Sequence, residues 1–297
     1  MSEAFDLRAW SDERLARVEA ALSDWVVADA PAGLGEAMRY AVLDGGKRLR
    51  PLLVLAASES VGGNTHAALR AACAVELIHA YSLVHDDMPC MDNDVLRRGK
   101  PTVHVQFGQA RALLAGDSLQ ALAFELLVPD DERIPAGVQA RMCRLLARAA
   151  GSEGMAGGQA IDLASVGVAL NEEQLRHMHR LKTGALLEGS VVMGAACGQP
   201  SASAQAALSR YGAALGLAFQ VVDDILDVTA DSATLGKTAG KDAQQDKPTY
   251  VSVMGLERSR AHARDLLAEA LQALRASGLP DTRALQALAT MVVERDN

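Results

Sequence analysis

The sequence predicts an all-α protein, and its composition and its hydrophobic periodicity both support this class. Ala and Leu are abundant and aromatic residues make up only 3% of the chain. Ala and Leu head the helix propensity scale, whereas β-branched and aromatic residues favour strands. Apolar residues also recur at helical spacing near the start, at Leu15, Val18, Leu22 and Val26. The sequence contains no strand-turn-strand alternation, no GxGxxG motif and no internal repeat.

Two long apolar runs predict buried helices. The first extends from Ala67 to Asp87, and we expect it to end near Met88 because Pro89 disfavours helical geometry there. The second extends from Ala206 to Val228. The one long polar stretch, 229–250, contains two glycines and three lysines and is predicted to be a mobile lid over an anion site. No change of composition marks a boundary, so we expect one domain over residues 1–297.

Charge and cysteine content exclude several classes of protein. The net charge of −8 argues against general nucleic-acid binding. The four cysteines are widely spaced without a CxxC pair, which indicates a reducing compartment. The N-terminus lacks a basic segment followed by an apolar core, and no uninterrupted apolar run approaches the roughly 18 residues of a membrane span. We therefore expect a cytoplasmic protein with no membrane span.

Two clusters of carboxylates stand at the ends of the apolar runs. The segment HDDMPCMDND holds Asp86, Asp87, Asp92 and Asp94 within nine positions, and DDILD begins at Asp223. One acidic run at a helix end is most often a solvated turn or a cap. Two such runs at apolar helix ends indicate a cation, because carboxylates without Cys or His ligands suit Mg²⁺ when phosphate oxygens complete its coordination.

Basic groups complement these acids. Arg and Lys side chains are what a diphosphate needs, although any one of them alone could be a solvated charge. The candidates are Lys47, Arg48 and Arg50 in GGKRLRP, Arg97 and Arg98 after the first cluster, Lys182 in LKTG, and Lys237, Lys241 and Lys247 in the predicted lid.

His79 lies two helical turns before Asp86, so both side chains should share a helix face about 10 Å apart. A lone histidine on an apolar helix is usually a core residue. The shared face favours a second diphosphate site beside the metal site. His85 is out of phase and is interpreted as structural, and Cys90 is too soft a ligand for Mg²⁺ and is interpreted as packing.

Together these residues resemble the trans-isoprenyl diphosphate synthases, particularly the bacterial farnesyl diphosphate synthases. DDMPCMD and DDILD match the two aspartate-rich motifs of that family, and GGKRLRP, RRGKPT, GMAGGQAIDL, LKTG and GKTAGKD follow the order of its other motifs. The resemblance implies an isoprenoid-synthase-type helical bundle around a deep central cavity, usually in a homodimer. It also implies head-to-tail condensation of an allylic diphosphate with isopentenyl diphosphate, with up to three Mg²⁺ ions.

The resemblance further implies a role for each motif residue. Asp86, Asp92 and Asp223 would bind the metal, with Asp87 and Asp227 acting behind them or through water. The allylic diphosphate site would comprise Arg97, Lys182, Thr183, Gln220, Lys237 and Lys247, of which Thr183 and Gln220 would steady the allylic cation. Isopentenyl diphosphate would bind Lys47, Arg50, His79 and Arg98. Tyr81 and Ser82 would form the cavity floor, so that the bulky Tyr81 stops elongation near fifteen carbons.

Other readings and two departures from the family pattern remain. A geranyl or geranylgeranyl diphosphate synthase would share every motif. A terpene cyclase would have an NSE-type second metal motif, and a di-iron bundle would need a second Glu-x-x-His pair besides Glu76 and His79. A non-catalytic relative would usually have lost an aspartate motif. The departures are Val95, where an acid is common in the family, and the ERDN end, where relatives often have a terminal basic residue. Either Arg295 replaces that residue or isopentenyl diphosphate binds more loosely.

Overall fold

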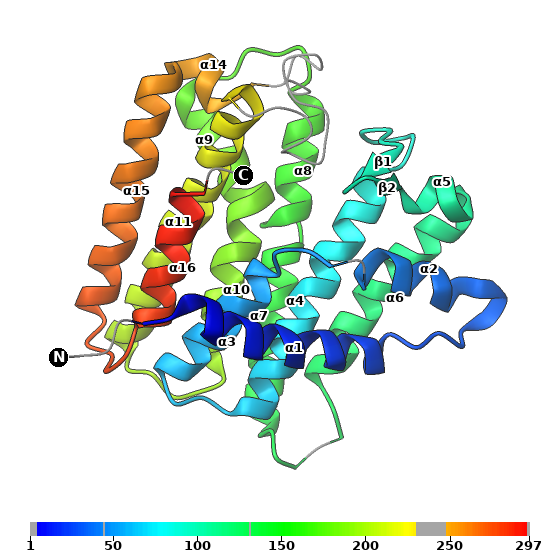
Figure 1. The fold of residues 1–297 in the computed structure, drawn as a ribbon, viewed down its shortest axis with the longest axis horizontal. Helices are drawn as coiled ribbons and strands as arrows, with labels where there is room; N and C mark the ends of the chain where they lie inside the picture. Colours follow the sequence, from blue (N-terminus) through cyan, green and yellow to red (C-terminus); the bar gives the residue numbers. More distant parts are fainter. Residues whose placement is uncertain (1–4, 44, 131, 230–247, 296–297) are drawn as a thin grey trace.

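The computed structural model describes residues 5–43, 45–130, 132–229 and 248–295 (Figure 1). Within them the prediction of an all-α protein is confirmed. The elements in chain order are α1 (Leu7–Trp25), η1 (Pro31–Gly33), α2 (Leu34–Val42), α3 (Leu49–Ser60), α4 (Thr65–Asp86), β1 (Leu96–Arg97), β2 (Lys100–Pro101), α5 (Val103–Phe107), α6 (Gln109–Leu127), α7 (Ala136–Ala150), α8 (Met155–Ala164), α9 (Glu172–His179), η2 (Arg180–Gly184), α10 (Ala185–Ala196), α11 (Ala202–Thr229), α14 (Tyr250–Met254), α15 (Leu256–Ala276) and α16 (Arg283–Val293).

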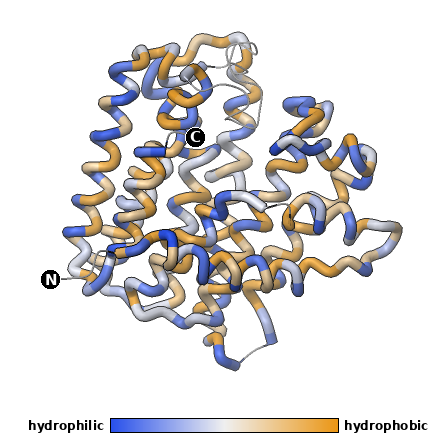
Figure 2. The backbone as a smooth tube through the Cα atoms, viewed as in Figure 1, coloured by the Kyte–Doolittle hydropathy of each residue, from blue (hydrophilic) through white to orange (hydrophobic). Residues whose placement is uncertain are grey.

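The two apolar runs form α4 and α11. Asn64 caps α4 by accepting hydrogen bonds from the backbone N–H groups of His66 and Ala67, and the helix ends at Asp86, as Pro89 predicts. α4 packs against α3, α6 and α10, and α11 packs against α10 and α15. Hydrophilic and hydrophobic residues alternate along the outer helix α15 (Figure 2), as in a helix with one face toward the core.

α4 is also the one helix in the described chain whose length and hydropathy would suffice to cross a membrane. Of its most apolar stretch, 67% is buried inside the protein. A helix buried among other helices is apolar on most of its surface, because few of its positions face water. The surrounding helices therefore account for the hydropathy of α4.

A small hairpin follows α4 that the sequence did not predict. β1 pairs antiparallel with β2, with Arg97 opposite Lys100. The two residues between the strands, Arg98 and Gly99, both have positive φ, at 52° and 77°. Two-residue turns of this hand match the twist of paired strands. Strands of two residues are too short to produce a detectable alternation of apolar and polar side chains.

Candidate functional site

A cavity of about 380 Å³ brings several of the predicted site residues together. It lies between the C-terminal half of α4, the helix α8 and the short element η2. Seven predicted residues line it: Arg50, His79, Tyr81, Ser82, Asp86, Lys182 and Thr183. Residues from distant parts of the sequence thus face one space. The shared face predicted for His79 and Asp86 is confirmed.

The first aspartate cluster forms a tight turn at the end of α4. The backbone N–H of Asp92 donates to the carbonyl of Asp86 at 2.9 Å, which holds the two residues side by side. Burial raises the pKa of Asp86 to about 6; the charge of Lys182 opposes this shift and that of Asp92 adds to it. Two ionised carboxylates therefore destabilise each other here, and a bound cation would relieve that repulsion.

The donor set fits Mg²⁺ held jointly with a ligand. Within the described chain, no three His, Cys, Asp or Glu side chains come close enough together to bind a metal ion by themselves. Mg²⁺ is commonly held by one or two carboxylates, with the other positions filled by water and substrate phosphates. Asp86 with Asp92, and Asp223 on α11, offer hard carboxylate oxygens of that kind.

Lys182 and Thr183 are presented by a π-helical turn, η2. Such turns are frequent at functional sites. Gly158 on α8 lets the turn come close, since a Cβ there would lie 2.0 Å from the backbone nitrogen of Lys182. The Nζ of Lys182 donates to Asp162 at 2.6 Å, and the Thr183 hydroxyl donates to the Gln220 amide oxygen at 2.9 Å.

Two residues of this region were not assigned a role from the sequence. Asp162 is 4% exposed and anchors Lys182. Gln159 lines the cavity, and both polar atoms of its buried amide lack a hydrogen-bond partner in the structure. Buried amides are nearly always paired, so Gln159 is prepared to contact a ligand. The motif GMAGGQAIDL contains both residues and was the available signal.

On α11, Asp223 meets the C-terminal end of the chain. The Arg295 guanidinium donates to the Asp223 carboxylate and to the backbone carbonyl of Phe219, and it lies over the Phe219 ring. Burial and the nearby Arg295 lower the pKa of Lys47, while Asp223 raises it. Lys47, Asp223 and Arg295 therefore lie within electrostatic reach of one another. Arg295 points toward a predicted site residue despite the atypical ERDN ending.

The three cations of GGKRLRP have different environments. Arg48 turns inward, where its guanidinium donates to Glu76 at 2.8 Å and to Glu19 at 2.6 Å. Arg50 lines the cavity with a buried Nε that has no hydrogen-bond partner in the structure. Arg48 is thus a structural residue and Arg50 is available to a ligand. The ion pair with Arg48 also accounts for the buried carboxylate of Glu76, so a di-iron site is not needed to explain this residue.

The loop before α3 joins this region to the hairpin. The Arg98 guanidinium donates to the carbonyl of Gly45 at 2.5 Å. Gly46 has φ of 134°, and a Cβ there would lie 2.8 Å from the same guanidinium. A glycine at this position therefore suits both the positive φ and the close approach of Arg98. Arg98 lies next to the segment that carries Lys47 and Arg50, as expected if these residues share a ligand.

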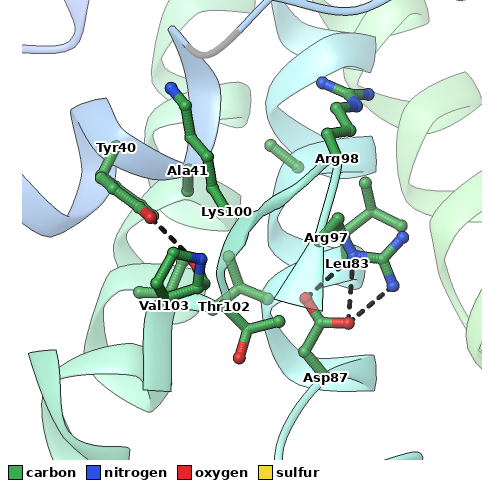
Figure 3. A pocket seen from close by; sticks show the side chains of 12 residues that line it. Tyr40, Ala41, Leu83, Asp87, Arg97, Arg98, Lys100, Thr102 and Val103 are labelled. Atoms are coloured by element: carbon green, nitrogen blue, oxygen red, sulfur yellow. Dashed lines mark hydrogen bonds and ion pairs between the residues drawn. The ribbon is translucent and has the colours of Figure 1, made fainter. Parts of the chain in front are cut away.

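Arg97 is not among the residues that line the large cavity. Its Nε and Nη2 bind the buried carboxylate of Asp87, with contacts of 2.6–3.0 Å. Figure 3 shows this ion pair in a separate pocket of about 50 Å³, which Tyr40 and Lys100 also line. Asp87 thus orients Arg97 and does not line the cavity. In this conformation Arg97 lies behind the first aspartate cluster.

His79 is held neutral. Burial lowers its pKa well below the ordinary value, and the positive charges of Arg50, Arg98, Arg97 and Arg48 lower it further. A neutral imidazole offers one N–H donor to a phosphate oxygen.

Tyr81 and Ser82 both line the cavity on the α4 side. The Tyr81 ring is 8% exposed and meets the His85 ring edge to face at 5.6 Å. His85 in turn packs on Gly116 of α6, where a Cβ would lie 2.1 Å from the imidazole. The Ser82 hydroxyl donates to the carbonyl of His79. The structural role expected for His85 is to support the Tyr81 ring.

The predicted lid residues Lys237, Lys241 and Lys247 lie outside the described residues.

Comparison with known proteins places this geometry in a family. The polyprenyl synthetase family profile matches residues 31–287. The chain is 49% identical over 289 residues to a probable farnesyl diphosphate synthase of Sinorhizobium fredii, covering 94% of this chain and 85% of that protein. It is 46% identical over 297 residues to a chloroplastic geranylgeranyl pyrophosphate synthase of Catharanthus roseus, covering 100% of this chain and 83% of that protein.

A solved structure agrees with these relatives. The geranyltransferase of Helicobacter pylori, complexed with magnesium and isoprenyl diphosphate, superposes with a TM-score of 0.83 at 34% identity. The match covers 99% of this chain and 98% of that one. The resemblance read from the motifs is thereby confirmed along nearly the whole chain, and the protein belongs to the polyprenyl synthetase family of prenyltransferases.

Proposed function

We propose that the protein condenses isopentenyl diphosphate head to tail with dimethylallyl and then geranyl diphosphate, giving farnesyl diphosphate and diphosphate. The observation that carries this proposal is one cavity whose wall includes Asp86, Lys182 and the ring of Tyr81. A polar end for a diphosphate and a bulky wall for a tail are what elongation of a short prenyl chain requires.

The charged residues are assigned to the two diphosphates. Lys182, fixed by Asp162, would bind the allylic diphosphate together with Lys237, and Arg97 and Lys247 would strengthen that site. Lys47, Arg50, His79 and Arg98 would bind isopentenyl diphosphate, since Arg98 packs on the loop of Lys47. Preorganised cations stabilise charge that develops on the leaving diphosphate without reorganising during the reaction.

The metal ligands would be Asp86, Asp92 and Asp223, holding up to three Mg²⁺ ions with the allylic diphosphate. Bound Mg²⁺ supplies charge stabilisation for the departing diphosphate. The apolar wall excludes water from the allylic cation formed when the C–O bond breaks. The double bond of isopentenyl diphosphate then attacks this cation, and the released diphosphate accepts the proton lost in forming the new double bond.

Thr183 and Gln220 would steady the cation. Both present neutral oxygen dipoles, which attract a carbocation without trapping it as a covalent adduct. Tyr81 and Ser82 would limit the tail to fifteen carbons, because the Tyr81 ring lines the cavity and is held by its edge-to-face contact with His85. Geranylgeranyl diphosphate, the product named for the Catharanthus roseus relative, is the alternative outcome of the same chemistry.

We also propose that residues 1–297 form one domain, that two copies form a homodimer, and that the enzyme works in the cytoplasm without nucleic-acid or membrane partners. Exposed apolar side chains on α6, including Leu113 and Leu114, would suit a subunit interface.

The metal and site assignments can be tested with purified protein, Mg²⁺, isopentenyl diphosphate and geranyl diphosphate. We expect condensation that a chelator abolishes. Asp86→Ala and Asp223→Ala should each lose about a thousandfold or more in rate, as expected when charge stabilisation of the transition state is removed. Circular dichroism should remain unchanged. Near-normal rates in both variants would refute the metal assignment.

A further inference from the structure

A directed chain of hydrogen bonds leads from the cavity into the protein. The Thr183 hydroxyl donates to Oε1 of Gln220 at 2.9 Å, and Nε2 of Gln220 donates to Oδ1 of Asp224 at 2.9 Å. Oδ2 of Asp224 accepts the backbone N–H of Tyr250 at 2.8 Å. Thr183 lines the cavity, whereas Asp224 does not. Asp224 can therefore influence the cavity through Gln220.

The direction of this chain follows from the chemistry of its members. An ionised carboxylate only accepts hydrogen bonds, so the amide nitrogen of Gln220 must face Asp224. The amide oxygen then faces Thr183, and the hydroxyl must donate its single hydrogen to that oxygen. The lone pairs of the Thr183 oxygen are left to face the cavity. If the amide were reversed, Thr183 would accept from it and direct its hydrogen elsewhere.

The two neighbouring acids of DDILD differ in burial. The Asp223 side chain is 37% exposed and meets Arg295, whereas that of Asp224 is 2% exposed. Asp224 lies 4.0 Å from the buried His179 ring, which stacks on Tyr250. A carboxylate enclosed in this way is poorly placed to bind a cation in the cavity.

Close backbone packing between α11 and η2 fixes the distance between the members of this hydrogen-bond chain. A Cβ at Gly216 of α11 would lie 2.7 Å from the Cα of Gly184 in η2. The helix that carries Gln220 and Asp224 therefore lies directly against the turn that carries Thr183. This packing fixes the position of the Gln220 amide, and the hydrogen bond to Asp224 sets which end of the amide faces Thr183.

We propose that Asp224 is a positioning residue, which orients the Gln220 amide so that Thr183 presents its oxygen lone pairs to the allylic cation. The inference rests on the proposed function and adds to it a role for Asp224, the second acid of DDILD. Asp224 does not bind metal in this role. It acts on the rate of ionisation and condensation and not on the binding of either diphosphate.

The test is a cycle of near-isosteric substitutions. In Asp224→Asn the side-chain oxygen must still accept from Tyr250, so the new amide nitrogen faces Gln220 and reverses its amide. In the double variant Asp224→Asn with Gln220→Glu, the amide introduced by the first substitution donates to the carboxylate introduced by the second, whose other oxygen accepts from Thr183. The double variant restores the original direction of the Thr183 hydroxyl, whereas each single variant disrupts the chain.

We expect kcat with geranyl diphosphate to fall about tenfold to a hundredfold in Asp224→Asn, the usual cost of losing an orienting partner. KM for both substrates should change less than about twofold, because the substitution leaves the binding of both substrates in the ground state untouched. The double variant should recover at least part of kcat relative to either single variant. If Asp224→Asn does not fold, the comparison of the double variant with Gln220→Glu still decides the question.

Tyr211→Phe is the matched control. Tyr211 is a buried residue of the same helix whose hydroxyl donates to the carbonyl of Leu285, far from the cavity. Loss of this hydroxyl should lower the melting temperature and leave kcat unchanged. Wild-type kcat in Asp224→Asn, or a double variant no faster than Gln220→Glu, would overturn the inference alone. Absence of condensation by the wild type would overturn the proposed function and this inference with it.

Discussion

The guanidinium of Arg295, the last residue that the structure describes, binds the carboxylate of Asp223. The two residues are separated by 72 positions and belong to the C-terminal end and to the second aspartate motif. Burial and the charge of Arg295 together lower the pKa of Lys47, so the positive charge of Arg295 lies close to a residue assigned to isopentenyl diphosphate. A cation bound at Asp223 would compete with Arg295 and free it to bind that diphosphate. Figure 1 shows α16, the helix that precedes Arg295, beside α11.

Replacement of Arg295 by alanine should therefore weaken binding of isopentenyl diphosphate. We expect its KM to rise about tenfold, since a charge-assisted hydrogen bond contributes roughly 1.5–3 kcal/mol. The KM for geranyl diphosphate should hardly change. Arg295→Lys, which keeps the charge, serves as the control and should stay near wild type in steady-state kinetics. An unchanged KM in Arg295→Ala would show that this residue plays no part in the site.

Shortening Tyr81 should lengthen the product. Tyr81→Ala removes the ring that lines the cavity and opens space against His85, so we expect twenty-carbon alcohols after dephosphorylation. Tyr81→Phe keeps the ring and should retain the fifteen-carbon product. Mass spectrometry of the alcohols distinguishes these outcomes. A fifteen-carbon product from Tyr81→Ala would mean that other residues set the limit.

Arg48 should matter for stability and not for substrate binding. Arg48 is 5% exposed and Glu76 is 4% exposed, so Arg48→Ala leaves a buried carboxylate without this partner. Loss of one member of a buried ion pair costs about 3–5 kcal/mol. Urea unfolding measures this loss. The exposed pair of Arg283 and Asp281 is the control, and Arg283→Ala should change stability little. A small effect of Arg48→Ala would contradict the structural role.

His179 should make the protein sensitive to acid. Burial is the main cause that holds its pKa at about 4, with Asp162 opposing this shift and Lys182 adding to it. The unfolded chain binds the proton near pH 6.5, so stability from this group is present above that pH and is lost as pH falls toward 4. The contribution is on the order of 2 to 3 kcal/mol.

His179→Phe keeps a stacking ring but cannot titrate. The loss of unfolding free energy between about pH 7 and about pH 4.5, measured without ligands, should be smaller in this variant than in the wild type by roughly that amount. Equal losses in the two proteins would show that His179 is not the group responsible.

The sequence was sufficient to predict the helical class, the long helices α4 and α11, and seven of the residues that line the cavity. Their signals are local, because apolar runs and motif spacing do not depend on distant partners. The sequence could not separate Arg48 from Lys47 and Arg50. Arg48 turns inward because it adopts a left-handed conformation and meets Glu19, 29 positions away. It also did not show that Arg97 binds Asp87, since Arg97 lies in a strand of only two residues, which leaves no detectable pattern in the sequence.

The most direct test of the account is the identity of the product. Purified protein would be incubated with Mg²⁺, isopentenyl diphosphate and, separately, dimethylallyl or geranyl diphosphate, and the dephosphorylated alcohols would be identified by mass. We expect farnesol as the main alcohol from both starters. Geranylgeraniol would keep the mechanism and contradict the role of Tyr81 as a floor. No condensation with either starter would contradict the central claim that these residues form a prenyltransferase site.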